Sequence, residues 1–225
     1  MTDANVCSII RLDVEVAVQA SLFGSEASSL NDGTAYEGSL PSGLVVVPDF
    51  LSKADERRLI AILDASDSTP WISDLRRRVK HFGFRYDYKA RALSSLDKIG
   101  ELPDWAAELG YRLVENEYFP STPQQVIVNE YLPGQGISPH VDHQACFGST
   151  VASVSLGSDV VMDFLSEDTN AAGHVLLAAR SAIILSGDAR YKWRHGITAR
   201  KRDSIDHMAF VRKRRLSLTF RTVLL

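Results

Sequence analysis

The sequence predicts a mostly β domain with flanking helices, an α+β fold whose core is a double-stranded β-helix jelly roll. After Gln124, many short segments of alternating apolar residues follow one another with turns between them, which is typical of a barrel or sandwich. Two segments with helical spacing of apolar residues come before that point. A chain of 225 residues with 45% hydrophobic and 24% charged residues can bury a core of this kind.

The folded domain is expected to begin near residue 43. Residues 1–42 contain few periodic apolar segments, so we expect a weakly ordered N-terminal extension there. Residues 43–123 are expected to supply supporting helices, and residues 124–225 the jelly-roll core. The first strand is expected at residues 44–48, an apolar run that a proline closes.

Two helices are expected before the β-rich part, at residues 53–63 and 104–117. Ser52 and Asp55 resemble a capping pair at the start of the first helix. Apolar residues recur at helical spacing in both helices, at Leu59, Ile62 and Leu63 and at Trp105, Leu109 and Leu113. Between the helices, residues 82–89 are rich in aromatic side chains and are expected to form a strand or a loop.

The remaining strands follow from alternation with a period of two. In the first of them, Val126 and Val128 share one face, while the other face carries Ile127, Asn129 and Tyr131. Further strands are expected at 149–156, 159–164, 174–178 and 182–185. The last strand, 215–223, has an apolar face of Leu216, Leu218 and Phe220 and a polar face of Arg215, Ser217, Thr219 and Arg221.

The composition indicates a reducing, cytoplasmic setting. The two cysteines, Cys7 and Cys146, give no disulfide framework, and the N-terminus lacks the basic-then-apolar pattern of a secretory signal. No apolar run approaches the ~20 residues that a membrane-spanning helix needs, so no membrane partner is expected. Cys146 is expected to be a small buried apolar residue, and a reactive thiol is the alternative.

The net charge of −3 hides a strong asymmetry along the chain. Residues 190–225 carry 11 Lys and Arg residues against two acids, a charge of +9, which leaves −12 for the rest of the chain. A second basic run is Arg76-Arg77-Arg78-Val79-Lys80. Such runs either hold the phosphates of a nucleic acid or are solvated, partly paired surface charges, and the sequence leaves both interpretations open.

Two clusters far apart in the chain resemble halves of one metal site. His140 and Asp142 are two residues apart, so both side chains project to one side of a strand end. Closure of a barrel can bring His195 beside them. Two histidines and one carboxylate on one face of a metal, with the opposite positions open, suit a non-haem Fe(II) oxygenase. The alternative is a loop hydrogen bond between His140 and Asp142, with His195 on the surface.

An Fe(II) oxygenase of this kind needs an electron donor, commonly an α-keto acid whose distal carboxylate requires a fork-shaped cation. Arg215 and Arg221 lie six residues apart on the polar face of the last strand, with Ser217 between them. Asn129 and Tyr131 share a strand face just before the metal-ligand segment, and both can hydrogen-bond a carboxylate. The alternative for the two arginines is an exposed strand face.

Together these residues resemble the AlkB family of Fe(II)/2-oxoglutarate dioxygenases. The similarity lies in the order Asn129-x-Tyr131, His140-x-Asp142, His195 and Arg215-x5-Arg221, and it covers roughly residues 43–225. It implies that the catalytic iron ligands are His140, Asp142 and His195. It also implies that 2-oxoglutarate is bound by Arg215, at the distal carboxylate, with Asn129, Tyr131, Ser217 and Arg221 assisting. Arg221 would hold either the keto-acid end or the carboxylates around the metal.

The resemblance also implies the reaction. Fe(II) is the metal cofactor, 2-oxoglutarate and O2 are co-substrates, and decarboxylation of 2-oxoglutarate to succinate accompanies hydroxylation of a C–H bond. When that carbon is an N-linked methyl group, formaldehyde leaves and the substrate is demethylated. The chain is more similar to the eukaryotic branch that includes a tRNA-modifying member than to the bacterial DNA-repair prototype.

The substrate residues are expected in a lid within residues 43–123. In nucleic-acid demethylases of this family, a loop before the core stacks on a flipped base, which makes Phe84, Tyr86 and Tyr88 candidates here. The alternative is a strand whose aromatic side chains pack on the core. His143 is either a substrate contact or a residue of the pocket rim. Gln144 stands where the bacterial prototype has an acidic residue that contacts the base, so recognition is expected to differ.

The expected function is oxidative demethylation or hydroxylation of alkylated DNA or RNA, with tRNA among the candidates. One alternative is the same chemistry on a protein side chain or small molecule. Another is a non-catalytic RNA-binding module, against which the complete set of ligand and arginine residues argues. No obligate protein partner is evident from the sequence.

Overall fold

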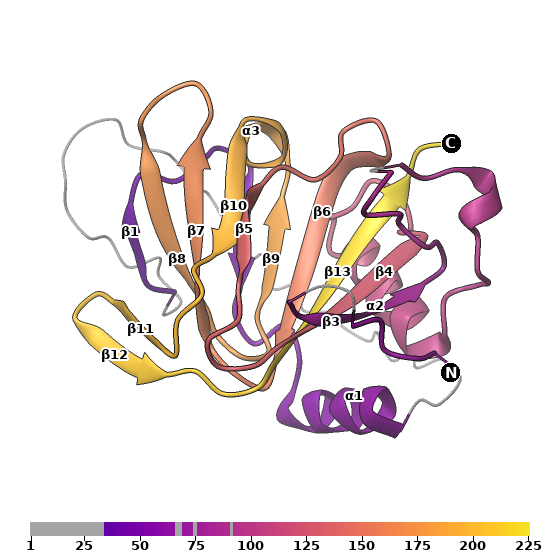
Figure 1. Cartoon of the computed structure of the whole chain (residues 1–225), viewed down its shortest axis with the longest axis horizontal. Helices are drawn as coiled ribbons and strands as arrows, with labels where there is room; N and C mark the ends of the chain where they lie inside the picture. The colour runs from indigo at the N-terminus through magenta and orange to yellow at the C-terminus, as the bar shows by residue number, and fades with distance from the viewer. Residues whose placement is uncertain (1–33, 66–68, 74–75, 91) are drawn as a thin grey trace, which may run out of the picture.

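The computed structural model describes residues 34–65, 69–73, 76–90 and 92–225. Two antiparallel sheets form its body (Figure 1). The five-stranded sheet has the order β1 (Tyr36–Gly38), β8 (Ala172–Leu177), β7 (Val160–Ser166), β10 (Trp193–Ile197) and β5 (Ile137–His140). The six-stranded sheet has the order β2 (Leu44–Val47), β9 (Ala182–Leu185), β6 (Phe147–Leu156), β13 (Arg215–Val223), β4 (Gln125–Tyr131) and β3 (Arg78–Phe82).

The other elements lie outside these two sheets. β11 (Arg202–Ile205) and β12 (Met208–Val211) form a separate hairpin. The helices are α1 (Lys53–Ala65), α2 (Asp104–Glu115) and α3 (Gly187–Tyr191), with a 3-10 turn, η1, at Ser95–Asp97. No helix in the described ranges is long and apolar enough to cross a membrane.

Each face of the six-stranded sheet packs on a different layer. Leu216, Leu218 and Phe220 of β13 belong to a buried cluster with residues of α1 and α2, so these helices cover the outer face. Tyr131 of β4 belongs to a second cluster with residues of the five-stranded sheet, which therefore covers the inner face. Because side chains alternate along a strand, the polar residues of β13 point into the space between the sheets. This arrangement confirms the predicted jelly roll with flanking helices.

Local sequence signals explain where several elements begin and end. The Ser52 hydroxyl accepts the Asp55 backbone N–H at 3.1 Å and donates to the Asp55 carboxylate at 2.7 Å, which caps α1 as expected. β9 and β13 begin and end where the alternation predicted. β3 ends at Phe82 because the next residue, Gly83, has φ +77, and a Cβ there would meet the carbonyl oxygen of Gln124 at 1.9 Å.

The structure differs from the sequence expectation in the last residues of the expected N-terminal extension. Residues 1–33 lie outside the described residues. Tyr36–Gly38 instead pairs with β8 at the edge of the five-stranded sheet, and Thr34 and Ala35 are buried. The packed fold therefore starts before residue 43. A three-residue strand is too short to show alternation, and its pairing with β8 determines its conformation.

Candidate active site

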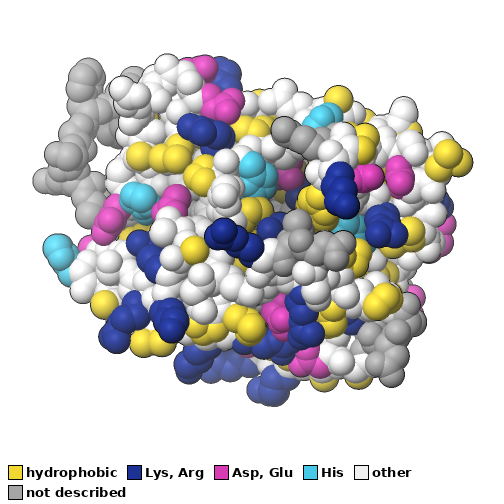
Figure 2. Space-filling model, in the orientation of Figure 1, with side chains coloured by type: hydrophobic (Ala, Val, Ile, Leu, Met, Phe, Trp, Pro, Cys, Tyr) yellow, Lys and Arg dark blue, Asp and Glu magenta, His cyan; other side chains and the backbone are white. Residues whose placement is uncertain are grey.

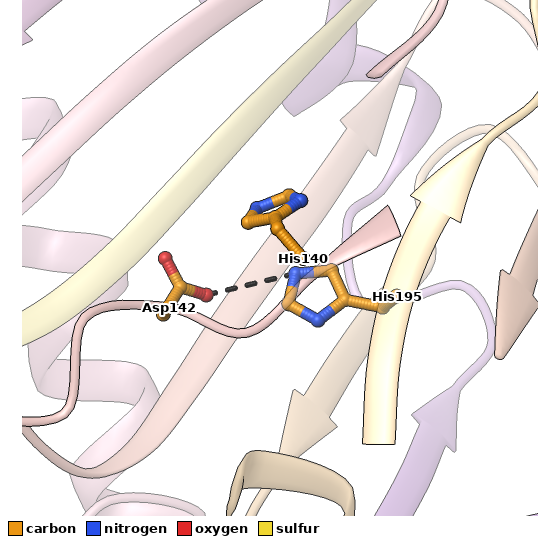
Figure 3. Close-up of side chains that lie close together, drawn as sticks. All are labelled: His140, Asp142 and His195. Atoms are coloured by element: carbon orange, nitrogen blue, oxygen red, sulfur yellow. Dashed lines mark ion pairs between the residues drawn. The ribbon is translucent and has the colours of Figure 1, made fainter. Parts of the chain in front are cut away.

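His140 and His195 face each other across neighbouring strands of the five-stranded sheet. β5 and β10 pair antiparallel with His195 opposite His140, and the two ring centroids lie 4.6 Å apart. Asp142 lies two residues beyond the end of β5, and its Oδ2 is 3.6 Å from His195 Nε2 (Figure 3). One donor atom from each side chain lies within 4.8 Å of the other two. Strand pairing thus brings the two sequence clusters together.

These three side chains are suited to a divalent metal ion, because their protonation states are those of metal ligands and because they have donor atoms without hydrogen bonds. Asp142 Oδ2 is buried and has no hydrogen-bond partner in the described part of the chain. Burial would raise the pKa of Asp142, but the Arg221 guanidinium and the two histidines hold that pKa well below its usual range. Burial lowers the pKa of His195 to about 4, against the opposing effect of Asp142. An anionic carboxylate beside neutral imidazole is the set that binds Fe(II).

The second nitrogen of His140 has a partner that fixes the ring. Its Nδ1 lies 2.9 Å from the carbonyl oxygen of Ser138, so an N–H donated there leaves the Nε2 lone pair available for a metal. Ser138 belongs to the same short strand, β5, and the ring orientation is therefore set by backbone that the strand pairing already holds.

Two buried arginines hold the segment that carries Asp142. Arg221 Nη2 donates to Asp142 Oδ1 at 2.5 Å and Nη1 to Gln125 Oε1 at 3.2 Å. Arg190, only 2% exposed, donates to the carbonyl oxygens of Asp142, Phe147 and Gly148. No sequence pattern marks Arg190 as buried, because one arginine within a basic segment has no distinctive spacing.

Arg215 is a buried cation with free donors. Its Nη2 donates to Ser155 Oγ at 2.8 Å, while Nε and Nη1 have no partner among the residues described. Burial lowers the pKa of Arg215 to about 10, which keeps the guanidinium charged at neutral pH. An isolated buried charge is costly, so this arrangement indicates a site for an anion. Ser217, on the same face, shares a hydrogen bond of 2.6 Å with Ser153.

Tyr131 lies between two guanidinium groups. The Cζ atoms of Arg215 and Arg77 are 5.5 Å and 5.7 Å from the centre of its ring. Arg77 Nε also donates to Asn129 Oδ1 at 2.8 Å, and Asn129 Nδ2 donates to the Ile127 carbonyl oxygen at 3.5 Å. The residues that the resemblance assigns to 2-oxoglutarate thus lie on two adjacent strands, β4 with Asn129 and Tyr131 and β13 with Arg215, Ser217 and Arg221. Arg77 is a further neighbour, which the sequence marks only as part of a basic run.

A cavity of about 200 Å³ adjoins the three proposed metal ligands. It is lined by Tyr86, Tyr88, Ile127, Asn129, His140, Val141, Asp142, His143, Phe147 and Arg221. A larger hollow of about 740 Å³ lies along α1 and α2 and contains none of these residues. Size alone would favour the larger hollow, but the convergence of ionisable groups makes the smaller one the candidate reactive site.

Aromatic side chains form one wall of this cavity. The ring centroids of Tyr86 and Tyr88 are 5.3 Å apart, and those of Tyr86 and Phe147 are 5.5 Å apart. His81 supports the wall: its Nδ1 accepts the Tyr86 backbone N–H at 3.1 Å, and its ring meets that of Tyr88 edge-on at 5.6 Å. The half-buried His143 also lines the cavity, and its buried Nδ1 has no hydrogen-bond partner in the described ranges.

Two expectations about the aromatic segment are wrong. Phe84 is 7% exposed and is absent from the cavity wall, and its carbonyl oxygen accepts the Gln125 side chain at 3.1 Å. It is a support residue, because the chain turns at Gly83 and sends Phe84 into the interior. The alternative of one continuous strand also fails, since β3 ends at Phe82.

The basic runs are mainly internal. Arg78 pairs with Glu130, and Lys80 is 1% exposed and donates to the Leu63 carbonyl oxygen at 2.9 Å. The phosphate-binding interpretation is therefore wrong for these two cations. In the C-terminal segment, internal hydrogen bonds or ion pairs also engage Arg190, Arg200, Arg212, Arg214, Arg215 and Arg221. Cys146 is buried, as expected.

Comparison with known proteins gives a family match over most of the chain. Residues 43–221 match the model of the 2OG-Fe(II) oxygenase superfamily. The chain is 39% identical over 169 residues to the tRNA (carboxymethyluridine(34)-5-O)-methyltransferase alkbh8 of Xenopus tropicalis, covering 74% of this chain and 27% of that protein. It is 32% identical over 204 residues to the alkylated DNA repair protein ALKBH8 homolog of Arabidopsis thaliana, covering 80% and 58%.

Other matches differ in length and in kind. The uncharacterized protein L905 of Acanthamoeba polyphaga mimivirus is 30% identical over 187 residues, with 81% of this chain and 86% of that protein covered. The solved structure of OsALKBH1 superposes with a TM-score of 0.63 at 18% identity, covering 82% and 98%, which supports the fold alone. The chain spans about a quarter of the length of the animal tRNA methyltransferases that it matches.

Proposed function

The chain belongs to the 2OG-Fe(II) oxygenase superfamily, as an AlkB-like dioxygenase that uses Fe(II), 2-oxoglutarate and O2, and on this premise we propose that it oxidises a modified base in RNA. The observation that carries the proposal is the aromatic-walled cavity beside His140, Asp142 and His195. A base that leaves its stack can enter such a cavity and place one carbon near the metal position.

In this proposal the bound iron supplies O2 activation coupled to oxidation of 2-oxoglutarate. The protein supplies binding and orientation. His140, Asp142 and His195 hold the metal, and the Arg221 guanidinium keeps the Asp142 carboxylate anionic and in place. Arg190 fixes the backbone of the ligand loop through three carbonyl groups, which resists displacement of Asp142 when the metal changes charge.

Arg215 is proposed to bind the distal carboxylate of 2-oxoglutarate through the guanidinium N–H donors that have no partner among the described residues. Charge-assisted, paired hydrogen bonds of this type are strong, and burial strengthens them further. Asn129 and Tyr131 complete the anion site from the neighbouring strand β4, whose residue Tyr131 is opposite Arg215 in the register of the sheet. The site is closed to bulk water because Arg215 and Tyr131 are 2% and 7% exposed.

The modified base is proposed to stack against the wall formed by Tyr86 and Tyr88. Stacking on aromatic side chains accepts any base, so a polar group has to distinguish the modified one. His143 is the candidate, because its buried Nδ1 has no partner within the described residues and the side chain lines the cavity. Gln144 is exposed and donates to the Tyr191 carbonyl oxygen at 3.3 Å, so it does not play the base-contacting part of the prototype's acidic residue.

The names of the animal relatives support RNA, and tRNA in particular, whereas the Arabidopsis thaliana relative is named for repair of alkylated DNA. The chemical outcome depends on the oxidised carbon. A methyl group on nitrogen that becomes hydroxylated leaves as formaldehyde, which gives demethylation. A hydroxylated carbon that is bonded to carbon keeps its oxygen. One reaction centre therefore serves both outcomes, and the substrate decides between them.

Succinate formation from 2-oxoglutarate tests the proposal. Protein loaded anaerobically with Fe(II) is exposed to O2 alone, with total tRNA, and with alkylated RNA and DNA oligonucleotides. We expect tRNA to stimulate succinate formation, and His140→Ala and Asp142→Ala to abolish it. Mass spectrometry of the nucleosides, with an assay for formaldehyde, then distinguishes gain of one oxygen atom from loss of a methyl group. Turnover that no nucleic acid stimulates would overturn the RNA substrate and favour a protein or small molecule.

A further inference from the structure

Three exposed cations of the C-terminal basic segment lie together on the surface. Lys201, Arg202 and Lys213 are exposed, and none has an ion pair within the part of the chain that the structure describes. The Arg212 backbone N–H donates to the Lys201 carbonyl oxygen at 3.0 Å, and Arg202 pairs with Val211 in the register of the β11–β12 hairpin. All three cations therefore lie at the open end of this hairpin.

A tight turn connects these cations to Arg76. In the turn Leu132–Gln135, Gly134 has φ +94, which suits glycine after proline, and the Gln135 N–H donates to the Leu132 carbonyl oxygen at 2.9 Å. The Gly134 N–H donates to the Arg200 carbonyl oxygen at 3.2 Å, and Gln135 Nε2 donates to that of Arg76 at 2.7 Å. Arg76 is exposed. We call Arg76, Lys201, Arg202 and Lys213 the hairpin-base surface.

No ion pair within the described ranges neutralises the charge of the hairpin-base surface. Asp203, the acid that follows Lys201 and Arg202 in the chain, is buried and already accepts hydrogen bonds from Arg200 and Arg212. Asp206 lies at the opposite, closed end of the hairpin, where its N–H binds Glu37. None of the four cations has an ion pair among the residues that the structure describes, and four such like charges create a positive potential that attracts an anionic polymer.

The hairpin-base surface adjoins the strand that leads to the metal ligands. β5 starts two residues after the turn Leu132–Gln135 and ends at His140, so about 13 Å of strand separates the turn from that ligand. In Figure 2, Lys and Arg side chains gather along the lower part of the face shown, over the region where Figure 1 draws β11, β12 and the loops that lead into β13. Exposed Leu132 and Val211 lie among these cations and offer apolar contact to sugars or bases.

From this arrangement we propose that the hairpin-base surface binds the phosphates of the RNA strand that flanks the base in the cavity. The proposal rests on the proposed function. It extends the proposed function, because the RNA would contact the protein from the cavity, along the turn Leu132–Gln135, to the β11–β12 hairpin. A polyanion is favoured over a single small anion because the cations are spread over two loops and have no common centre that the structure shows.

Binding of a fluorescein-labelled tRNA transcript at several NaCl concentrations tests the proposal. The test variant is Lys201→Ala/Arg202→Ala. The matched control is Lys98→Ala/Arg58→Ala, which removes one Lys and one Arg from exposed ion pairs with Glu101 and Glu108. Each phosphate contact contributes about 0.7 to the slope of log affinity against log salt for a single strand. We expect the test variant to bind about tenfold more weakly and to lose about 1.4 units of slope, while the control keeps both values.

Succinate formation without nucleic acid separates this proposal from the proposed function. It is expected to be equal in the wild type, the test variant and the control, because none of the four positions touches the metal or 2-oxoglutarate residues. Equal weakening by both double variants would overturn the hairpin-base surface and indicate diffuse electrostatic attraction. Absence of tRNA binding by the wild type would overturn it as well. If poly-glutamate competes with tRNA for the wild type but not for Lys201→Ala/Arg202→Ala, the partner of the hairpin-base surface would be an acidic protein and not RNA.

Discussion

Arg221 and Asp142 form a buried ion pair in which Nη2 lies 2.5 Å from Oδ1, and the two residues come from β13 and from the segment after β5. The sequence left two roles open for Arg221, contact with the keto-acid end of 2-oxoglutarate or contact with the carboxylates around the metal. The pair with Asp142 supports the second role. It also leaves Asp142 Oδ2 as the oxygen without a hydrogen bond, beside His195.

Replacement of Arg221 by Met is expected to weaken metal binding. A residue that orients a metal ligand typically contributes about 10–100-fold in metal affinity. The metal affinity of Arg221→Lys should lie between those of Arg221→Met and the wild type, because lysine keeps the positive charge. Titration with Mn(II), followed by electron paramagnetic resonance, measures the affinity without turnover. Arg58→Met is the control for loss of one arginine, and circular dichroism checks that each variant is folded. Unchanged Mn(II) affinity in Arg221→Met would contradict the role.

Arg215→Met is expected to abolish measurable binding of 2-oxoglutarate while leaving Mn(II) affinity intact. Loss of two hydrogen bonds to a charged group, at about 1.5–3 kcal/mol each, corresponds to at least a hundredfold weaker binding. Arg215→Lys keeps the positive charge but loses the fork-shaped guanidinium, so its affinity for 2-oxoglutarate should lie between those of Arg215→Met and the wild type. Calorimetric titration of the Mn(II)-loaded protein with 2-oxoglutarate gives the affinities. Equal affinity for Arg215→Met and the wild type would remove Arg215 from the anion site.

Arg77→Met is expected to have a smaller effect on the same titration. The Arg77 guanidinium holds the Asn129 side-chain oxygen at 2.8 Å, so its loss lets the amide rotate. One hydrogen bond contributes about 1 kcal/mol, and 2-oxoglutarate should bind roughly fivefold more weakly. The double variant with Asn129→Ala should lose less affinity than the sum of the two single losses, because Arg77 acts partly through Asn129 and partly through its contact with the Tyr131 ring. Fully additive losses would show that Arg77 does not act through Asn129.

The Asp203 carboxylate makes the fold sensitive to acid. Burial would raise the pKa of Asp203, but hydrogen bonds from Arg212, Val161 and Arg200 lower it below its ordinary value. A lowered folded-state pKa gives stability that is present above the unfolded value, near 4, and is lost as the pH falls through the folded value. The free energy of unfolding of the wild type in urea should therefore fall as the pH drops below about 5. Asp203→Asn should be less stable at pH 7 and show a flatter decline, whereas an unchanged slope would mean that other carboxylates dominate.

Elements with strong local alternation could be predicted from the sequence. β13 and β9 were located to the residue because alternating or continuous apolar side chains mark a strand between two packed layers. The capped start of α1 was likewise predictable from Ser52 and Asp55. The short elements β1, α3, β10, β11 and β12 were not, because, unlike β9 and β13, they show neither a long alternation nor a run of branched apolar residues, and they take their conformation from the strands beside them.

The sequence by itself determined the jelly roll, the two histidines and the aspartate of the candidate metal site, and the arginine on β13, because residue type and local periodicity are written in the chain. Tertiary structure alone decided which cations are internal and which face solvent. Arg190 and Lys80 are buried, whereas Lys201 and Arg202 are exposed, although all four belong to basic runs. Burial and pairing depend on contacts between segments far apart in the chain, such as β5 with β10, and such contacts have no local sequence pattern.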